Sequence, residues 1–188
     1  MKIYKELEIT ESDLKEILRK HELWLKGEPG GECANLKYCD LTGADLEGAN
    51  LRKANLAGGN FEEVNLIGAN LEEANLESAD FDGALLHDTN FKGANANHAS
   101  FWSASLQDAN FENANCEHAY FWGSCLSGAN FENANCEYAD FFDSYLLRAN
   151  FKGANAKHAS FRRADLRKTN FENAHLKGAD FDATVLQK

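Results

Sequence analysis

Large apolar residues recur at every fifth position along most of this chain. From Ala34 to Lys188 the sequence divides into 31 five-residue units without an insertion. Each unit carries a small residue, a polar residue that is usually Asn or Asp, a Leu or Phe, and two variable residues. Side chains five apart would point in different directions on an α-helix, and an odd step would alternate them between the faces of a straight strand. The chain must therefore bend once in every unit.

A second period, of twenty residues, predicts how many bends close one coil. Four units with bends of about 90° form a square turn, and like residues then lie above one another at roughly the 4.8 Å spacing of paired strands. Phe recurs in this way at Phe81, Phe101, Phe121, Phe141 and Phe161, and again at Phe91, Phe111, Phe131 and Phe151. We therefore predict an all-β solenoid, a quadrilateral parallel β-helix of about seven to eight coils.

The same pattern predicts which side chains fill the coils. The large residue and the small residue two positions before it both point inward, as in a strand. Buried Cys116 and Cys136 then act as small apolar side chains rather than redox groups. Asn columns outside the core can form side-chain ladders. These columns include Asn50, Asn70, Asn90, Asn110, Asn130, Asn150 and Asn170.

The unit A(N/D)(L/F)xx, unbroken over residues 34–188, resembles the pentapeptide-repeat family. This resemblance implies that the β-helix is right-handed. It implies little about function, because members of the family include gyrase-protecting mimics of DNA and cyanobacterial proteins that affect differentiation, and one fold serves many functions.

Residues 1–33 lie outside the repeat and predict a capping helix over about residues 11–26. Thr10 is placed as the N-cap with Asp13 near the capping-box position, and Gly27 ends the helix. One face is apolar: Leu14, Ile17, Leu18, His21 and Leu25. Because repeat arrays need capped ends, we expect this face to cover the open end of the residue 34–188 solenoid. Binding in a partner's groove is the alternative.

The last units predict no such cap. They stop half way round a coil and leave unpaired strand edges, with Leu186 near the mouth. We expect this end to pair with a second copy, giving a homodimer, or to fray. Gyrase-protecting relatives usually carry a C-terminal dimerising segment, and this chain has no recognisable one, which weakens that functional parallel.

The composition of the chain indicates which cellular compartment and which classes of binding partner to expect. The formal net charge of −11 disfavours direct binding to nucleic acid and to anionic membranes. The five cysteines have no CxxC spacing, and no apolar run is long enough for a signal or a membrane span. We expect an acidic, cytoplasmic protein without a membrane association.

Catalytic and metal sites are not predicted. A solenoid without loop insertions offers no cleft for a nucleophile, base or cofactor, so we expect neither an enzyme nor a cofactor. The best metal candidate is a corner column, His98, His118, Tyr138 and His158. Two neighbouring His side chains do not complete a zinc site and Tyr138 interrupts the column, so no metal is expected.

Aromatic residues replace charged ones at one outward position of three consecutive coils. They either reinforce the stacking of coils or form a binding hot spot, and the sequence leaves both readings open. The candidate partner-binding residues are this column and its neighbours: Trp102, Trp122, Phe142, Tyr120, His98, His118 and Tyr138.

The predicted function is a non-catalytic scaffold that presents a rigid surface to a protein partner. The alternative is a DNA mimic that binds and protects a type II topoisomerase. Such a mimic needs long lines of carboxylates in place of phosphates. One outward column instead mixes signs, reading Arg52, Glu72, Lys92, Glu112, Glu132, Lys152 and Glu172. The mixed charges favour the scaffold.

Overall fold

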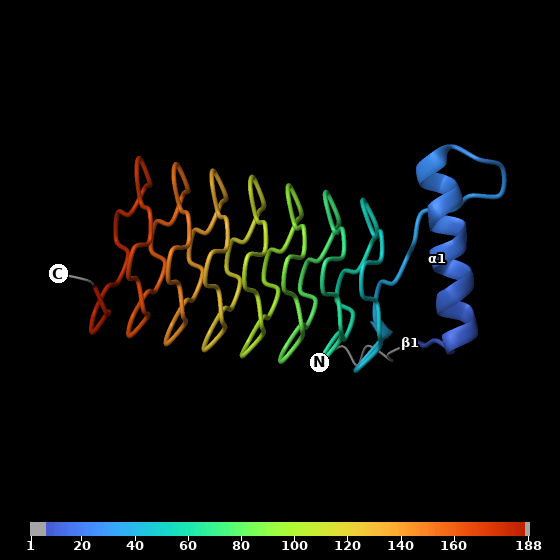
Figure 1. The fold of residues 1–188 in the computed structure, drawn as a ribbon, viewed down its shortest axis with the longest axis horizontal. Helices are drawn as coiled ribbons and strands as arrows, with labels where there is room; N and C mark the ends of the chain where they lie inside the picture. The colour runs from blue at the N-terminus through green and yellow to red at the C-terminus, as the bar shows by residue number, and fades with distance from the viewer. Residues whose placement is uncertain (1–6, 187–188) are drawn as a thin grey trace, which may run out of the picture.

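A stack of square coils with a helix across one end forms the molecule, in a computed structural model that describes residues 7–186 (Figure 1). Its named elements are β1 (Leu7–Glu8), α1 (Glu11–Lys26) and β2 (Cys39–Asp40). The coils are joined by parallel single-residue bridges twenty residues apart, from Asn35–Asn55 to Asp165–Val185. The predicted right-handed quadrilateral β-helix is confirmed.

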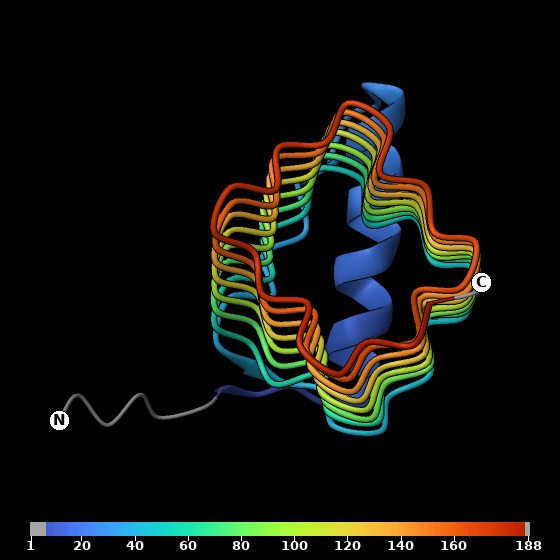
Figure 2. The same ribbon diagram turned by 90° about the vertical axis from the view of Figure 1, so that its left-hand side faces the viewer.

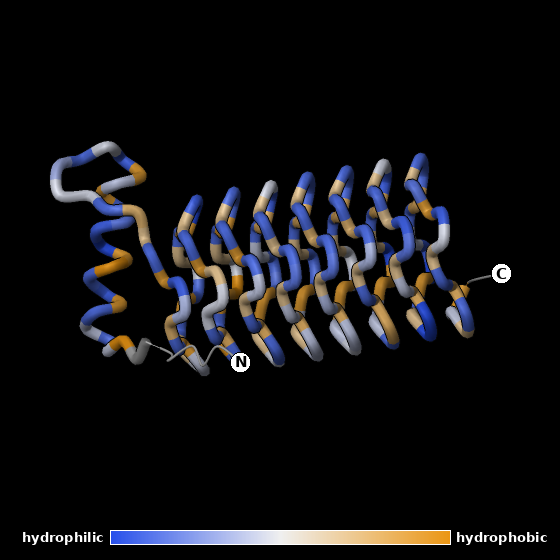
Figure 3. Tube along the Cα trace, turned by 180° about the vertical axis from the view of Figure 1, so that it is seen from behind, coloured by the Kyte–Doolittle hydropathy of each residue, from blue (hydrophilic) through white to orange (hydrophobic). Residues whose placement is uncertain are grey.

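Four walls surround the core, and Figure 2 shows the coils superimposed around one square outline. We name each wall by its inward side chains. In each coil, a wall consists of the inward residue, the residue before it and the two residues after it. Wall A is centred on Phe81, Phe101 and Phe121, wall B on Leu86, Leu106 and Leu126, wall C on Phe91, Phe111 and Phe131, and wall D on Ala96, Cys116 and Cys136. Hydrophobic and hydrophilic residues alternate along every coil (Figure 3). All of these inward side chains are fully buried.

Phe side chains fill the middle of the solenoid in two interlocking columns. Within wall C, Phe111 stacks on Phe131 with ring centroids 4.8 Å apart and an interplanar angle of 1°. Between walls, Phe111 meets Phe121 edge to face at 5.6 Å and 89°. The quadrupoles of the aromatic rings favour both of these geometries. The regular sequence spacing therefore produces one continuous aromatic core.

A tight turn at every corner lets the chain bend once per unit. In a representative turn, the Ala54 N–H donates to the Leu51 carbonyl at 3.0 Å, and Lys53 between them has φ of 62°. The third turn residue lies in this left-handed region throughout, although many of these residues are not glycine. Because that conformation costs a non-glycine residue roughly 1–2 kcal/mol, packing and bonds between coils must hold the turns in place.

The predicted Asn ladders are present on walls C and D. On wall C the Asn130 amide donates to Asn110 at 3.1 Å and accepts from Asn150 at 3.0 Å. On wall D the Asn115 amide donates to Asn95 at 3.1 Å and accepts from Asn135 at 3.1 Å. Each ladder ties successive coils together outside the core.

Helix α1 crosses the end of the solenoid and covers its first coil (Figures 1 and 2). Thr10 and Asp13 exchange the reciprocal hydrogen bonds of a capping box, and Gly27 ends the helix at φ of 70°. Leu14 is buried against the core. His21 is also fully buried, and its Nδ1 accepts from the Ala34 N–H at 3.0 Å. The helix thus supplies both an apolar cover and a hydrogen-bond acceptor to the first coil.

Two features of this end have no counterpart in the sequence analysis. Strand β1 pairs with β2 in parallel, Leu7 opposite Cys39 and Glu8 opposite Asp40, so the segment before the helix extends one wall. Gly31 lies so close to the helix that an added Cβ would be 2.3 Å from the backbone nitrogen of Trp24. Glycine there allows the chain to turn from the helix into the first coil. Across residues 7–186 no helix is long and apolar enough to cross a membrane.

Candidate protein-binding surface

Walls A and B expose large side chains between their regular buried columns. Trp102 and Trp122 are each 48% exposed, Tyr120 is 51% exposed and Tyr145 is 57% exposed. Large apolar side chains are costly to leave in water, and contiguous groups of them mark interaction surfaces. These side chains lie on consecutive coils of two adjacent walls.

Trp102, Trp122 and Phe142 form the centre of this surface, and we call them the aromatic stripe. Each directly follows an inward Phe of wall A, so the turn places its side chain outward. The rings of Trp102 and Trp122 lie 6.0 Å apart at a tilt of 42°, and Trp122 meets Phe142 edge to face at 5.7 Å. Phe142 is half-buried. The stripe is therefore continuous but irregularly packed, which leaves parts of its ring faces open.

His98, His118, Tyr138 and His158 form a second column, the corner ladder, where wall D turns into wall A. Successive ring centroids lie 4.8, 5.0 and 5.1 Å apart, and the interplanar angles are 4°, 5° and 10°. Each inner ring is thus covered on both faces by its neighbours. The structure separates the predicted aromatic residues into a ladder of parallel stacked rings and an irregularly packed stripe, and Tyr138 of the ladder is as exposed as Trp102 and Trp122, at 48%.

Tyr120 lies on wall A beside the stripe, while two further exposed side chains belong to wall B. Tyr145 and Leu85 precede inward Leu residues, at positions where walls C and D carry Asn. The sequence analysis missed both residues. The missing Asn at these positions is the signal that could have found them.

Carboxylates dominate walls A and B at the N-terminal side of the stripe. Between residues 40 and 108, Lys and Arg occur only on wall C. The outward acidic residues of walls A and B over this stretch are Asp40, Asp45, Glu47, Glu62, Glu63, Asp80, Asp82, Asp88 and Asp108. Burial raises the pKa of Asp80, and the nearby charges of Asp82 and Glu62 raise it further. This part of the surface concentrates negative charge.

The two Arg residues of wall A directly beyond the stripe form ion pairs. Arg162 pairs with Asp180 at 3.7 Å and with Asp182 at 3.5 Å. Arg163 pairs with Asp143 at 3.3 Å, and its guanidinium lies 5.3 Å from the centre of the Phe142 ring. The two ends of the stripe therefore differ in charge balance.

The mixed-sign column of wall C resolves into ion pairs between successive coils. Lys92 lies 3.0 Å from Glu112, Lys152 lies 3.6 Å from Glu132, and Arg52 lies 3.6 Å from Glu72. Exposed pairs of this kind contribute little to stability, but they leave the wall electrically balanced. Over the coils beside the stripe, the charges of wall C are therefore more nearly balanced than those of wall A.

Metal coordination finds no support in the part of the chain that the structure describes. There, no group of three or more His, Cys, Asp or Glu side chains can hold a metal ion. The parallel His98 and His118 rings stack face to face, which does not direct their nitrogens at a shared ion. Cys116 and Cys136 are buried free thiols, and burial raises the pKa of Cys136 well above its ordinary range.

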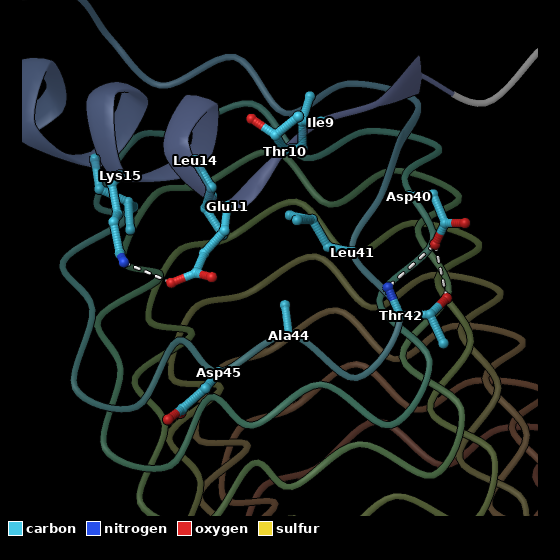
Figure 4. A pocket seen from close by; sticks show the side chains of 11 residues that line it. Ile9, Thr10, Glu11, Leu14, Lys15, Asp40, Leu41, Thr42, Ala44 and Asp45 are labelled. Atoms are coloured by element: carbon cyan, nitrogen blue, oxygen red, sulfur yellow. Dashed lines mark hydrogen bonds and ion pairs between the residues drawn. The ribbon is translucent and has the colours of Figure 1, made fainter.

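A separate groove of about 430 Å³ lies between α1 and the first coil (Figure 4). Its apolar lining includes Ile9, Leu14, Leu41 and Ala44. Figure 4 shows the Glu11–Lys15 ion pair at its edge and the Asp40–Thr42 hydrogen bonds on its far side. It is an imperfectly filled seam of the cap, and none of the predicted binding residues lines it.

Comparison with known proteins identifies the repeat. No curated protein sequence matches the chain. Solved structures that resemble it include HetL, a pentapeptide-repeat protein involved in heterocyst differentiation regulation in Nostoc sp., at 27% identity over 81% of each chain with a TM-score of 0.49. QnrB1, a plasmid-mediated fluoroquinolone resistance protein, is 22% identical over 79% of this chain and 86% of its own, with a TM-score of 0.46. Rfr23 of the cyanobacterium Cyanothece is 26% identical over 93% and 99%, with a TM-score of 0.41.

The sequence models of two related families cover nearly the whole solenoid. The model of the pentapeptide repeat region matches residues 34–111, and that of pentapeptide repeats in eight copies matches residues 109–146 and 144–182. Together with the square coils and the five-residue turns, these matches establish that the chain belongs to the pentapeptide-repeat proteins.

Proposed function

We propose that this chain is a non-catalytic scaffold that binds a protein partner through the aromatic stripe. The observation that carries the proposal is the exposure of Trp102, Trp122 and Tyr120 on one wall of a rigid solenoid. Trp and Tyr are enriched among the residues that dominate binding energy at interfaces. A solenoid presents them at fixed spacing, so little conformational entropy is lost on binding.

The proposal also accounts for the chemistry of the rest of the surface. Pentapeptide-repeat proteins are generally structural scaffolds. The grooves along the walls are open and shallow, and an open groove does not exclude water as catalysis usually requires. The free cysteines fit a reducing compartment, and we place the protein in the cytoplasm on that ground.

The test is a comparison of two double variants after the partner has been identified by cross-linking and mass spectrometry from native lysate. W102S/W122S should keep the circular dichroism spectrum of the wild type and lose binding to the purified partner by about a hundredfold, because it removes two central anchors. K92S/E112S changes two half-buried, ion-paired side chains of wall C and should bind normally. Normal partner binding by W102S/W122S would refute the proposed function.

Binding to a type II topoisomerase as a DNA mimic is the second candidate. The run of outward carboxylates on walls A and B, without Lys or Arg between residues 40 and 108, favours it. A DNA-binding groove is basic and would attract such a surface. A gyrase supercoiling assay with added protein tests this candidate, and an unchanged rate of supercoiling at saturating protein would remove it.

Self-association through the last coil completes the proposal. Backbone N–H groups of Phe171, Leu176 and Phe181 have no hydrogen-bond partner among residues 7–186, and Leu186 is 65% exposed. Unpaired strand edges of this kind favour pairing with a second copy. Light scattering of the purified chain should give the mass of a dimer, and a monomer at every concentration would exclude this part of the proposal.

A further inference from the structure

The N-terminal end of the aromatic stripe borders a groove. This groove, of about 270 Å³, is lined by Glu62, Glu63, Asp82, Gly83, Trp102 and Ser103. We call it the Trp102 groove. It combines one half-exposed indole with three carboxylates from the two preceding coils. At the opposite end of the stripe, an Arg side chain already lies against the Phe142 ring.

The carboxylates of the Trp102 groove have no cationic partner among the described residues. Asp82 accepts hydrogen bonds from the Ser100 hydroxyl and from the backbone N–H of Trp102, the latter at 3.0 Å. The carboxylates of Glu62 and Glu63 take part in no hydrogen bond or ion pair within residues 7–186. Asp80 adds a fourth acidic group behind them, and the pKa of Asp80 is raised by burial and then by Asp82 and Glu62. A cation in the groove would relieve this repulsion.

The shape of the groove selects among cations. The carboxylates are spread over two coils and do not converge on one point, and the described part of the chain holds no three-ligand metal cluster. A guanidinium is flat, carries five N–H donors and stacks on aromatic faces. It can therefore face the Trp102 indole while donating to carboxylates at its edge, an arrangement that the Arg163–Phe142 contact illustrates at the other end.

We propose that the Trp102 groove binds an arginine side chain from a basic segment of the protein partner. An apolar side chain further along that segment rests on Trp122 and Phe142. Coils repeat at roughly 4.8 Å, while alternate residues of an extended chain lie about 6.6 Å apart, so an arginine and an apolar residue two positions later fit the groove and the stripe. This inference rests on the proposed function and specifies the chemistry of the partner.

The probe is a synthetic peptide, acetylated and amidated, of sequence Gly-Arg-Gly-Leu-Gly. Its binding can be followed through the indole N–H signals of the ¹⁵N-labelled protein by NMR, which reports weak affinities directly. The Trp102 signal should shift and saturate with peptide, while the signal of Trp24 on α1 should stay in place. A peptide with citrulline in place of arginine has nearly the same shape without the charge, and it should bind about tenfold more weakly.

Matched variants separate the groove from the general negative charge of the protein. E62Q/E63Q should weaken peptide binding about tenfold, whereas E112Q/E132Q on wall C, which changes the net charge equally, should leave it within about twofold. Failure of the Trp102 signal to shift, equal binding of the citrulline peptide, or equal weakening by both double variants would each overturn the assignment.

The two proposals fail in different experiments. If the peptide does not bind but W102S/W122S still loses the purified partner, the stripe is a binding surface and the arginine assignment is wrong. If the peptide binds as expected but W102S/W122S retains the partner, the groove recognises arginine and the proposed function of the stripe is wrong.

Discussion

Walls C and D and walls A and B share one core but differ on the outside through the middle coils. On walls C and D the residue before each inward side chain is Asn through most of the solenoid, and these amides bond from coil to coil at 2.9–3.4 Å. On wall A the same position reads Asp80, Ser100, Tyr120, Asp140 and Ser160, and on wall B it reads Leu85, Ser105, Cys125, Tyr145 and Asp165. The inward Phe and Leu residues of these two walls are nevertheless as fully buried as those opposite.

This difference shows that the outer surface is not required to be regular for the coils to stack. An intramolecular hydrogen bond contributes about 0.5–1.5 kcal/mol, so walls A and B have given up measurable stabilisation at several coils. In place of these hydrogen bonds, walls A and B carry half-exposed aromatic rings and uncompensated carboxylates. Natural proteins depart from locally optimal choices mainly at functional sites, and this departure is confined to one half of the surface.

The largest expected effect tests the claim that the core is the same behind both kinds of wall. F111A on wall C and F121A on wall A should each lower the free energy of unfolding by about 3–5 kcal/mol, because each leaves a cavity among stacked and edge-to-face rings. Urea unfolding followed by circular dichroism measures both. A loss for F121A of less than half that for F111A would mean that wall A packs more loosely inside as well as outside.

A smaller effect should distinguish the walls directly. N130A removes two ladder bonds and the acceptor of the Glu132 N–H, and should cost about 2 kcal/mol. Y120A, at the equivalent position of wall A, removes an exposed ring with no side-chain hydrogen bond and should cost less than about 0.5 kcal/mol. The same denaturation assay serves for both variants. Equal losses would show that the Asn ladders add no stability beyond that of an ordinary outward residue.

The repeat explains why the fold was predictable and the surface only partly so. A five-residue period that fits neither helix nor strand forces a bend, and the twenty-residue recurrence of Phe counts the bends, so the square coil follows from spacing alone. The aromatic stripe was predictable because Trp102 and Trp122 occupy an outward position of the repeat at which neighbouring coils carry charged residues. The β1–β2 pairing was not, since strands of two residues carry no periodic signal. The pairing of Arg162 across coils likewise depends on rotamers that sequence does not specify.

His21 of helix α1 lies at the start of wall D, and its titration allows the contribution of the cap to stability to be tested by changing the pH. Burial lowers the pKa of His21, although the nearby backbone of Arg52 and the charge of Glu22 oppose this. The folded state therefore binds fewer protons than the unfolded state between the lowered pKa and the ordinary value of about 6.5, so stability is complete above that value and falls as the pH falls through this window. Protonation of Nδ1 would also remove the acceptor for the Ala34 N–H.

Calorimetry between pH 7.5 and pH 5.5 should accordingly show a falling melting temperature for the wild type. H21Q should be less stable at neutral pH but should lose most of this pH dependence, because glutamine does not titrate. The pH range lies above the ordinary pKa values of Asp and Glu, which limits their contribution. An unchanged slope in H21Q would assign the pH dependence to other groups and leave the cap insensitive to acid.

The smallest expected effect separates the two aromatic columns that the sequence grouped together. In the corner ladder, His118 is stacked on both faces, at 4.8 Å from His98 and 5.0 Å from Tyr138, and such contacts contribute about 0.5–1.5 kcal/mol each. H118N keeps a residue that tolerates the φ of 56° at this position, so its loss of about 1 kcal/mol would report the stacking and not backbone strain. Trp122 is half exposed and is tilted against Trp102 rather than stacked on it, so W122S should cost less than about 0.5 kcal/mol. If W122S instead destabilises the protein as much as H118N does, the stripe is a second structural ladder, and the exposed aromatic surface of wall A stabilises the stack of coils in place of the missing amides.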